Sequence, residues 1–428
     1  MARIVLNTFG SLGDLHPYLA VALQLREHGH DVTIATSEIY RAKILAEGIN
    51  FAPVRPDTGE LMDNPQFLRR LWHPRRGTEY LIREYILPAL EQSYADLLPI
   101  CSRADLLLTH IAGYAGPLVA EKLQLRWLSV ALQPAAFFSV YDPPVLAPAP
   151  LLRHLYRFGK WPFSLVLAIA NRETRRWAKP VFRLRKRIGL PDSDANPILK
   201  GHFSPFGTLA MFSRHLAQAQ PDWPQGVQIT GFAFYDKLGA ISGTPATHPE
   251  EIDALNRFLD SGPPPVLFTL GSSAFLQAGN FYSESITTTR KLGVRAVLLT
   301  GTGARGQRNE SLFEANYVPY SQIMPRAAVN VHQGGIGTTA QALRAGRPML
   351  VVPWAHDQPD NAERVRKLGV ARVIPRARYR AARIAKELTA LLEDPRSRAQ
   401  AQEIGAKIRA EDGARNAVEA IEKLLHAS

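Results

Sequence analysis

The sequence has one cysteine, Cys101, in 428 residues, so no disulfide can form within the chain. Such scarcity is typical of proteins in a reducing compartment. The sequence also lacks any apolar run near the ~20 residues that a helix needs to span a bilayer. Its first residues enter a strand-like run, without the charged and apolar regions of a secretory signal. We therefore expect a cytoplasmic protein, and a peripheral location at the inner membrane face stays open.

Patterns for metal and nucleic-acid binding are also scarce. The triplet Asp192-Ser193-Asp194 has the DxD form of some metal sites, but it stands in a loop rich in Pro and Asn, in the half of the chain opposite the sugar-phosphate pattern described below. His332 has no second ligand at metal-binding spacing. No helix-turn-helix, zinc-finger or RNA-recognition pattern accompanies the net charge of +13. We expect neither a bound metal nor a nucleic-acid partner.

The positive charge is concentrated in residues 153–187 (Arg153 to Arg187). This stretch holds eleven Lys and Arg and one acid, Glu173, and the aromatic residues Trp161, Phe163 and Trp177 are interleaved with the charges. A solvated basic helical face is the common explanation of such a pattern. The aromatic residues favour a second one, contact with an anionic membrane surface.

Strand and helix patterns alternate in both halves of the chain. Strand-like runs at residues 3–8, 31–36 and 51–54 enclose helical patterns at 17–28 and 39–47, which predicts a parallel, doubly wound α/β sheet. The alternation restarts near residue 249. We predict two Rossmann-like domains that face each other across a cleft. The expected division is an N-terminal domain at 1–235, a linker at 236–248, a C-terminal domain at 249–405, and a helix at 406–428 that returns to the N-terminal domain.

A strand–turn–helix–strand pattern occupies residues 331–362. An apolar run ends in His332, and a turn rich in glycine and hydroxyl groups leads into a helix. Bare backbone N–H groups at the N-terminus of a helix form a binding site for phosphate. The residues of this turn are Gly334, Gly335, Gly337, Thr338 and Thr339.

A second set of polar residues follows the next apolar run. Asp357, Gln358 and Asn361 come after residues 348–353, which we predict to be a buried parallel strand. Ligands of open α/β sheets bind beyond the carboxyl ends of the strands. Because these side chains suit a ligand rich in hydroxyl groups, the two sets together predict a site for a phosphate joined to a sugar.

The first turn, GSLGD, does not follow the dinucleotide-binding GxGxxG pattern. Its Asp14 stands near the start of the first helix, where aspartate is common as a cap. The same position also suits a general base that points into a cleft. His16 is a second candidate base, although a single histidine before a proline is more often structural.

Five segments then give a specific resemblance. They read GSLGDLHPYLAVALQLREHGHDVTIAT, TGFAFYD, LGSS, YVPYSQIMPRAAVNVHQGGIGTT and PWAHDQPDNAERV, and they are spread over essentially the whole chain. The chain resembles a family 1 glycosyltransferase of GT-B fold. The subgroup it resembles most is the bacterial rhamnolipid-type rhamnosyltransferases, and sterol glucosyltransferases and glycopeptide-antibiotic glycosyltransferases are similar but more distant.

The resemblance implies a function. Such enzymes move a rhamnose- or glucose-type sugar, with inversion, from a dTDP- or UDP-sugar to a hydroxyl of a hydrophobic small-molecule or lipid acceptor. They need no cofactor beyond the nucleotide-sugar donor. By resemblance, Asp14 is the base and the N-terminal domain binds the acceptor. His332, Thr338 and Thr339 bind the diphosphate.

The resemblance also assigns roles to the remaining donor-site residues. Ser272 and Ser273 approach the diphosphate from a facing loop. The backbone near Val318 reads the nucleotide base, and Tyr317 stands near the place of a stacking tryptophan in plant relatives. Asp357 and Gln358 hold sugar hydroxyls.

The sequence departs from its relatives at two functional positions. Many relatives have a histidine at the position of Asp14, oriented by a distant aspartate. Here the later strand ends in Thr109-His110, so we expect no His–Asp relay; an unperturbed aspartate, with a pKa of about 4, is a weak base unless its surroundings raise that pKa. Plant relatives also place a ribose-binding glutamate eight residues after His332, where this chain has Ala340. This favours dTDP over UDP, although mildly.

Alternatives stay open at the level of function and of the acceptor site. An epimerase acting on nucleotide sugars has the same two-domain layout, and a non-catalytic protein could use the basic stretch to bind a membrane or ligand. The loop at residues 133–150, rich in proline and aromatic residues, is either a wall of an acceptor pocket or a packed connector.

Overall fold

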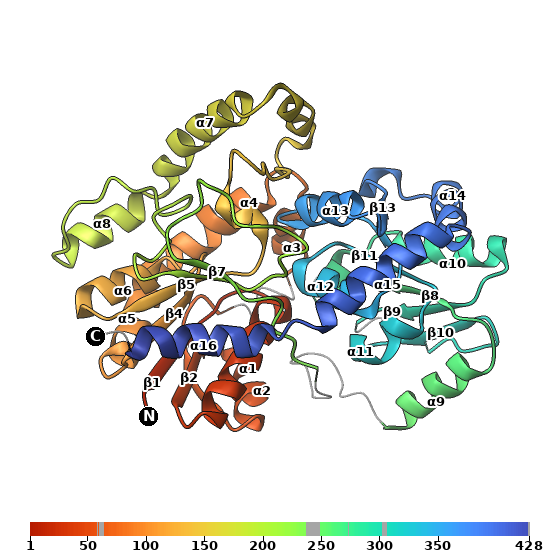
Figure 1. The fold of residues 1–428 in the computed structure, drawn as a ribbon, viewed down its shortest axis with the longest axis horizontal. Coiled ribbons are helices and arrows are strands. Elements are labelled where there is room, and N and C mark those ends of the chain that lie inside the picture. Colours follow the sequence, from red (N-terminus) through yellow and green to blue (C-terminus); the bar gives the residue numbers. More distant parts are fainter. Residues whose placement is uncertain (58, 60–63, 237–248, 273, 302–305, 427–428) are drawn as a thin grey trace. The chain divides into compact units, whose positions relative to one another are not determined.

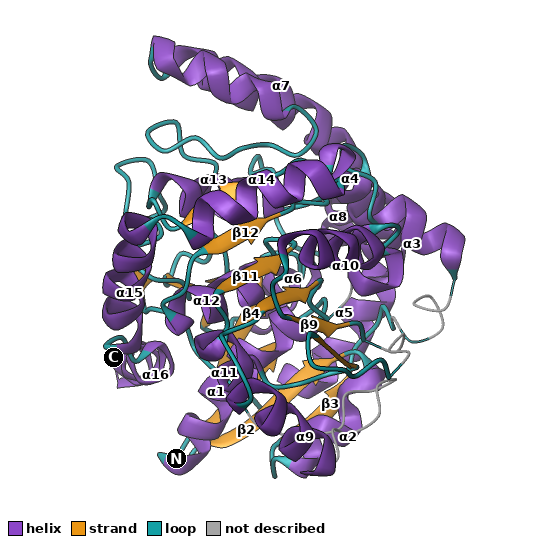
Figure 2. Cartoon of the chain, turned by 90° about the vertical axis from the view of Figure 1, so that its right-hand side faces the viewer, coloured by secondary structure: helices purple, strands orange, loops and turns teal. Residues whose placement is uncertain are grey.

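The computed structural model describes residues 1–57, 59, 64–236, 249–272, 274–301 and 306–426. The chain forms two compact units, which we call unit 1 (Met1–Tyr235 with Glu411–Ser428) and unit 2 (Asp236–Ala410). The linker expected at 236–248 lies outside the described residues, except for Asp236. Each unit is an α/β structure in which helices cover the strands (Figures 1 and 2). The prediction of two doubly wound parallel sheets is confirmed.

Unit 1 contains a seven-stranded sheet in the order β3-β2-β1-β4-β5-β6-β7, and every neighbouring pair is parallel. The inner strands are buried on both faces and are therefore almost wholly apolar. The strands are β1 (Arg3–Asn7), β2 (Asp31–Thr36), β3 (Asn50–Pro53), β4 (Leu106–His110), β5 (Trp127–Ala131), β6 (Thr208–Ala210) and β7 (Val227–Ile229).

The helices of unit 1 connect these strands and cover the sheet. They are α1 (Leu12–Glu27), η1 (Glu38–Tyr40), α2 (Arg41–Ala46), α3 (Pro65–Leu71), α4 (Gly77–Tyr80), the π-helical η3 (Leu81–Ile86), η4 (Leu87–Ala89), α5 (Leu90–Cys101), α6 (Ala115–Leu123), η5 (Pro134–Phe137), η6 (Pro150–Phe158), α7 (Trp161–Trp177), α8 (Lys179–Arg187) and α16 (Gly413–His426). The last of these, α16, packs against α1. Its Leu424 carbonyl accepts a hydrogen bond from Arg126 (2.9 Å).

Unit 2 contains a six-stranded parallel sheet in the order β10-β9-β8-β11-β12-β13. The strands are β8 (Val266–Thr269), β9 (Ala296–Leu299), β10 (Leu312–Ala315), β11 (Val329–His332), β12 (Met349–Val351) and β13 (Ala371–Val373). The helices are α9 (Pro249–Asp260), η7 (Ala274–Gln277), α10 (Phe281–Leu292), α11 (Tyr320–Ile323), η8 (Met324–Arg326), α12 (Ile336–Ala345), α13 (Gln358–Lys367), η9 (Arg376–Arg378), α14 (Ala381–Leu392) and α15 (Pro395–Arg409).

Three local expectations were wrong. Helix α1 begins at Leu12 rather than at residue 17, because Ser11 caps it and Pro17 is accommodated within the helix. The three-residue edge strands β7 and β13 were missed, since a run of three residues carries too little pattern. The helix expected at 406–428 begins only at Gly413, because α15 continues to Arg409 and the chain passes from unit 2 to unit 1 between the two helices.

Candidate functional site

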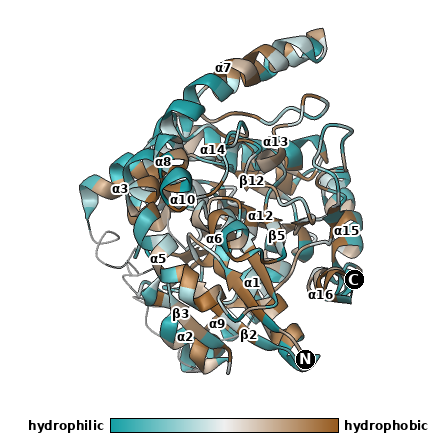
Figure 3. Cartoon of the chain, turned by 90° about the vertical axis from the view of Figure 1, so that its left-hand side faces the viewer, coloured by the Kyte–Doolittle hydropathy of each residue, from teal (hydrophilic) through white to brown (hydrophobic). Residues whose placement is uncertain are grey.

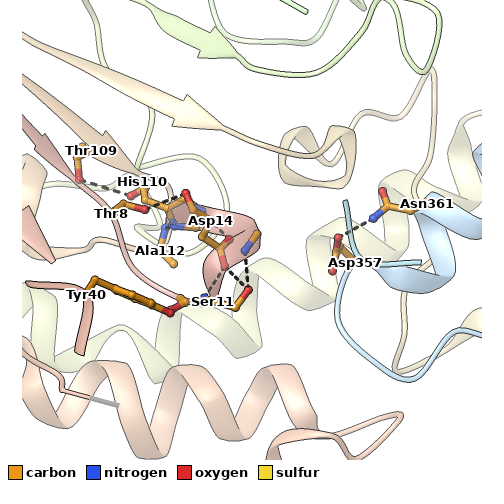
Figure 4. A network of polar contacts seen from close by, with 11 residues as sticks. Thr8, Ser11, Asp14, Tyr40, Thr109, His110, Ala112, Asp357 and Asn361 are labelled. Atoms are coloured by element: carbon orange, nitrogen blue, oxygen red, sulfur yellow. Dashed lines mark hydrogen bonds and ion pairs between the residues drawn. The ribbon is translucent and has the colours of Figure 1, made fainter. Parts of the chain in front are cut away.

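In unit 1 the strand order reverses between β1 and β4, which is where open α/β sheets bind ligands. The two strands are adjacent and parallel, with Asn7 opposite Thr109. Asp14 follows β1 on the first turn of α1, and His110 is the last residue of β4. The topology therefore brings together two residues that are 96 positions apart in the sequence (Figure 4).

One oxygen of the Asp14 carboxylate is held by the start of α1. Oδ2 accepts hydrogen bonds from the backbone N–H of Ser11 (2.7 Å) and from its hydroxyl (3.1 Å). The first of these is half of a capping box, in which the Ser11 side chain in turn accepts from the backbone at Asp14. Gly10, at φ +126°, makes room for this carboxylate, because a side chain there would collide with Oδ2. The other oxygen, Oδ1, lies 3.8 Å from Nε2 of His110.

The hydrogen bonds of His110 define its tautomer. The backbone N–H of Ala112 donates to Nδ1 (3.1 Å), so the proton of the neutral ring is on Nε2, the nitrogen that faces Asp14. A separation of 3.8 Å is too long for a direct hydrogen bond. It is, however, short enough for one bridging hydroxyl oxygen, and Nε2 is buried with no hydrogen-bond partner among the described residues.

Burial shifts the pKa of both groups. Desolvation raises the pKa of Asp14 to about 6, against the opposing effect of its hydrogen bonds to Ser11. Desolvation lowers the pKa of His110 to about 4. At neutral pH the pair is therefore a carboxylate beside a neutral imidazole that donates from Nε2. The Asp14 side chain is still 27% exposed, so a substrate can reach it.

His110 is a functional candidate that the sequence pattern marks only as the end of a strand. The structure places its ring beside the carboxylate of Asp14. The expectation that the chain has no relay in which an aspartate orients a histidine base stays a prediction. The available signal was that Thr109-His110 ends the strand that pairs with the first one. His16, two residues after Asp14, points elsewhere on the helix, and its ring packs 5.0 Å from that of Tyr235.

Aromatic side chains surround the Asp14 turn. The Tyr40 hydroxyl donates to the Gly10 carbonyl (3.0 Å), and the ring of Phe9 lies 5.9 Å from that of Tyr85. In the described part of the chain the buried Tyr85 hydroxyl has no hydrogen-bond partner, and the residue belongs to the π-helical segment η3. Such segments are frequent at functional sites. These residues therefore offer aromatic rings to the apolar part of a ligand and a hydroxyl group to its polar part.

In unit 2 the predicted glycine turn joins β11 to α12. His332 ends the strand, and its Nδ1 accepts a hydrogen bond from the Gly334 N–H (3.1 Å). Gly334 adopts φ +89°, and a side chain at this position would lie 2.8 Å from Val351. Burial lowers the pKa of His332 to about 3, so its ring is neutral and carries its proton on Nε2. Strand, turn and helix are as predicted.

This turn gathers buried polar atoms that have no hydrogen-bond partner. Within the described residues they include Nε2 of His332, Oε1 of Gln333, Oγ1 of Thr339 and Oδ1 of Asn361. Native structures leave few buried polar atoms unpaired, and each one needs an explanation. A polar ligand that supplies the missing partners is the explanation that fits a cluster of them.

The N-terminus of α12 is open as well. Its N-cap is Gly335, which contributes no side-chain hydrogen bond, and Gly337 and Thr338 lie in the first turn. The first backbone N–H groups of a helix have no partner within the helix, and the helix dipole favours an anion there. The turn therefore offers neutral hydrogen-bond donors to a group such as a diphosphate.

The polar residues after β12 reach the same turn. Asn361 donates from Nδ2 to the Gly334 carbonyl (3.0 Å) and to Asp357 (2.6 Å). Gln358 accepts at Oε1 from the backbone N–H groups of Trp354 and Ala355, so its amide N–H groups remain as donors. His356 has φ +58°, a conformation rarely adopted by residues other than glycine and common at functional sites.

The other predicted donor residues follow neighbouring strands of the same sheet. Ser272 comes directly after Gly271, whose backbone approaches Gln333 so closely that a side chain would collide with it. Tyr317 and Val318 follow β10, and Val318 is fully buried. Ser273 lies outside the described residues.

Two further sequence features have local structural roles. Asp194 of the DxD triplet lies 3.6 Å from Arg175, and in the described part of the chain no three His, Cys, Asp or Glu side chains are grouped so that they could hold a metal ion. In the loop at 133–150, Phe137 is buried and stacks on Trp223 with ring centroids 4.0 Å apart. At Phe137 the loop is therefore a packed connector.

Comparison with known proteins gives consistent matches for both units. Residues 4–135 match the glycosyltransferase family 28 N-terminal domain, and residues 309–424 match the C-terminal domain described as erythromycin biosynthesis protein CIII-like. The chain is 30% identical to O-mycaminosyltylonolide 6-deoxyallosyltransferase of Streptomyces fradiae, over 98% of this chain and 97% of that protein. It is 27% identical to sterol 3-beta-glucosyltransferase of Pichia angusta, of which it spans 33%.

A solved structure has the same fold over essentially its whole length. The spinosyn rhamnosyltransferase SpnG complexed with thymidine diphosphate superimposes with a TM-score of 0.67, at 18% identity, over 99% of this chain and 100% of that one.

Proposed function

This chain belongs to the family 1 glycosyltransferases of GT-B fold, and we propose that it transfers a sugar, with inversion, from a nucleoside diphosphate to a hydroxyl of a hydrophobic acceptor. The observation that carries the proposal is the Asp14–His110 pair, a reachable carboxylate with its pKa raised to about 6 beside a neutral N–H donor. A general base works best when its pKa lies near the operating pH.

The pair would hold the acceptor hydroxyl between its two members. The hydroxyl donates its proton to Oδ1 of Asp14, and its oxygen accepts from Nε2–H of His110, which fits the gap of 3.8 Å. As the oxygen attacks C1 of the sugar, its proton passes to Oδ1. Asp14 is thus the base, and His110 positions the nucleophile.

The α12 turn would hold the departing diphosphate. When the bond between C1 and the phosphate oxygen breaks, the electron pair and a negative charge stay on that oxygen. Nε2–H of His332, the hydroxyls of Thr338 and Thr339 and the N–H groups at the start of α12 are donors suited to stabilising this charge. We propose that they do so without a metal ion.

Asp357 and Gln358 are proposed to hold the sugar. Asp357 offers carboxylate oxygens and Gln358 offers amide N–H groups, which complement the two roles of a hydroxyl. Tyr317 and the Val318 backbone are proposed to contact the nucleotide base, with Ser272 and Ser273 near the phosphates.

We propose dTDP rather than UDP as the preferred nucleotide, and a deoxysugar such as rhamnose ahead of glucose. Ala340 is buried on α12 and offers no carboxylate to a ribose 2′-hydroxyl. The solved relative with thymidine diphosphate and the 6-deoxyallosyltransferase support the same choice. The aromatic residues around Asp14, and relatives named for tylonolide and sterol acceptors, support a polycyclic or macrocyclic alcohol.

The test is a matrix of UDP- and dTDP-sugars against hydrophobic alcohols, in which both nucleotide release and product mass are measured. The expected result is nucleotide release that requires an alcohol, with a glycoside of inverted anomeric configuration by NMR. Release or sugar rearrangement without any alcohol would point to an epimerase and would contradict the proposal.

A further inference from the structure

The described residues of unit 1 carry a concentration of exposed apolar side chains on η6 and α7. Six of the ten large apolar side chains that are exposed in the described structure lie within 19 residues, and each is 41% to 74% exposed. They are Leu151, Leu155, Phe158, Trp161, Leu165 and Ile169. We call this the apolar stripe. Single exposed apolar residues are ordinary, but a contiguous group marks a contact surface.

The stripe is presented by a well-anchored segment. On the inner side of α7, Phe163 is fully buried and packs edge-to-face on Tyr156, with ring centroids 5.2 Å apart. The Tyr156 hydroxyl donates to the Pro144 carbonyl (3.1 Å), and Asn196 donates to Thr174 near the end of α7 (2.8 Å). Trp161, Leu165 and Ile169 recur every four residues, so they form one line along α7. Figure 3 shows that both apolar and polar residues occur along this helix.

Cations occupy the same surface as the stripe. The Arg157 guanidinium lies 4.8 Å from the ring centroid of Phe158, and the Lys160 ammonium lies 3.5 Å from that of Tyr141. Both rings are exposed. Arg172 continues the outer line of α7 and is exposed. In the whole stretch 153–187 the only acid is Glu173, which pairs with Arg176 (2.8 Å).

We propose that the apolar stripe and its cations dock unit 1 on the surface of an anionic lipid bilayer. A helix with apolar and aromatic residues on one line and Lys and Arg beside them lies in the plane of the interface, with the apolar groups in the acyl boundary and the cations among the headgroups. Tryptophan is favoured at this depth. A second copy of this chain suits the surface less well, because its own net charge is +13. The proposal is independent of sugar transfer.

The test is co-sedimentation with vesicles of phosphatidylcholine, either pure or with 30% phosphatidylglycerol. We expect the wild type to bind the anionic vesicles at 50 mM salt, to bind pure phosphatidylcholine at least tenfold more weakly, and to be released as salt rises to 500 mM. Two triple variants should each lose at least tenfold in partitioning: W161S/L165S/I169S and R157Q/K160Q/R172Q.

Matched controls separate the surface from general charge and hydrophobicity. R290Q/K291Q/K367Q removes three exposed cations of unit 2, and L45S/F206S removes two exposed apolar side chains elsewhere on unit 1. Both should bind as the wild type does. Thermal unfolding and circular dichroism verify that each variant is folded, and vesicles with brominated lipids should quench tryptophan fluorescence in the wild type but not in W161F.

Several results would overturn the proposal. These are absence of binding to anionic vesicles at 50 mM salt, unchanged binding of either triple variant, and equal loss of binding in the control variants. If the wild type did not bind vesicles but formed a dimer, and W161S/L165S/I169S abolished that dimer, the apolar stripe would be assigned to contact with a second copy of the chain.

Discussion

The N-termini of α1 and α12 are used in opposite ways. Ser11 and Asp14 close the start of α1 with a capping box, so the anion that the helix end favours belongs to the chain itself. The start of α12 has a glycine N-cap without a side-chain hydrogen bond. We propose that its anion comes from a ligand, which would also supply partners for the buried polar atoms that have none among the described residues.

The difference shows how one topology supports two kinds of chemistry. Both sites lie at the carboxyl ends of parallel strands, yet one holds an ionisable carboxylate whose Oδ1 faces His110, and the other holds neutral polar groups. Natural proteins break local rules of stability at functional sites. Among the described residues, the uncapped helix with buried unpaired polar atoms is such a case, and at the capped helix it is the partly desolvated carboxylate of Asp14.

The largest expected effect comes from Asp14→Asn. Turnover should fall about 10³-fold, because the amide cannot accept the proton, while nucleotide affinity stays unchanged. Stability should be equal or higher, since the amide oxygen still accepts from Ser11 and a desolvated charge is gone. Initial rates, calorimetric binding of the nucleotide and thermal unfolding measure the three quantities.

Asp394→Asn is the matched control for this change. Asp394 also caps a helix, accepting from the backbone N–H of Arg396 (3.0 Å), but it lies in neither site. Its variant should keep full turnover. If Asp14→Asn turned over at a rate close to that of the wild type, Asp14 would not be the base.

The second effect tests the open helix end. His332→Ala should weaken nucleotide binding by about 10- to 100-fold, as expected for loss of one hydrogen bond to a charged group. His332→Gln keeps an N–H donor and should recover part of the affinity. Nucleotide affinities of the two variants that equal the wild-type value would remove His332 from the phosphate site.

The third effect separates the two members of the unit 1 pair. The pKa of about 6 for Asp14 predicts that kcat/KM falls as pH drops through 6, because the protonated carboxyl cannot act as a base, and that it levels off above this pH. His110→Asn should reduce kcat about tenfold but keep the midpoint near 6. Loss of the midpoint in this variant would mean that His110, rather than Asp14, is the titrating group.

The sequence predicts the strand, turn and helix around His332 in unit 2 well, and it does not predict which residues meet at Asp14 in unit 1, for a physical reason. The features around His332, Gly334 and Thr339 are local, because the residues that determine the strand end, the tight turn and the helix start lie within about ten residues of one another. The proximity of His110 to Asp14 depends on β1 pairing with β4 in one register, across about 100 residues. Short-range patterns do not contain that information.

The same reason explains two other outcomes. Tyr85 lies in a stretch with an ordinary helical pattern, and its place beside Phe9 follows from the π-helical turn and the tertiary packing. Strand β2 was predicted to the residue, because it is a largely buried run that the sequence bounds at both ends. Patterns therefore predict elements better than they predict which elements meet.

The fourth effect comes from adding a side-chain cap to the N-terminus of α12 and removing the cap from the N-terminus of α1. Gly335→Ser adds a hydroxyl that can cap α12, so it should raise stability by a few tenths of a kcal/mol and weaken nucleotide binding severalfold. Ser11→Ala removes the capping hydroxyl of α1 and should cost about 1 kcal/mol of stability. It should also raise the pH midpoint of kcat/KM, because a hydrogen bond that lowers the pKa of Asp14 is lost. Denaturant unfolding and pH–rate profiles measure these changes. A Gly335→Ser variant with unchanged nucleotide affinity would show that the open helix end is not reserved for a ligand.

The smallest effect concerns the nucleotide. Ala340 is buried one turn into α12, so Ala340→Glu places a carboxylate where it can accept from a ribose 2′-hydroxyl. One such hydrogen bond contributes about 1 kcal/mol, so the ratio of UDP to dTDP affinity should rise about threefold to fivefold, as measured by competition calorimetry. Ala340→Gln is the neutral control and should shift the ratio less. Equal weakening of both nucleotides would show that position 340 affects only packing, and the preference for dTDP would then depend on other residues of the unit 2 site.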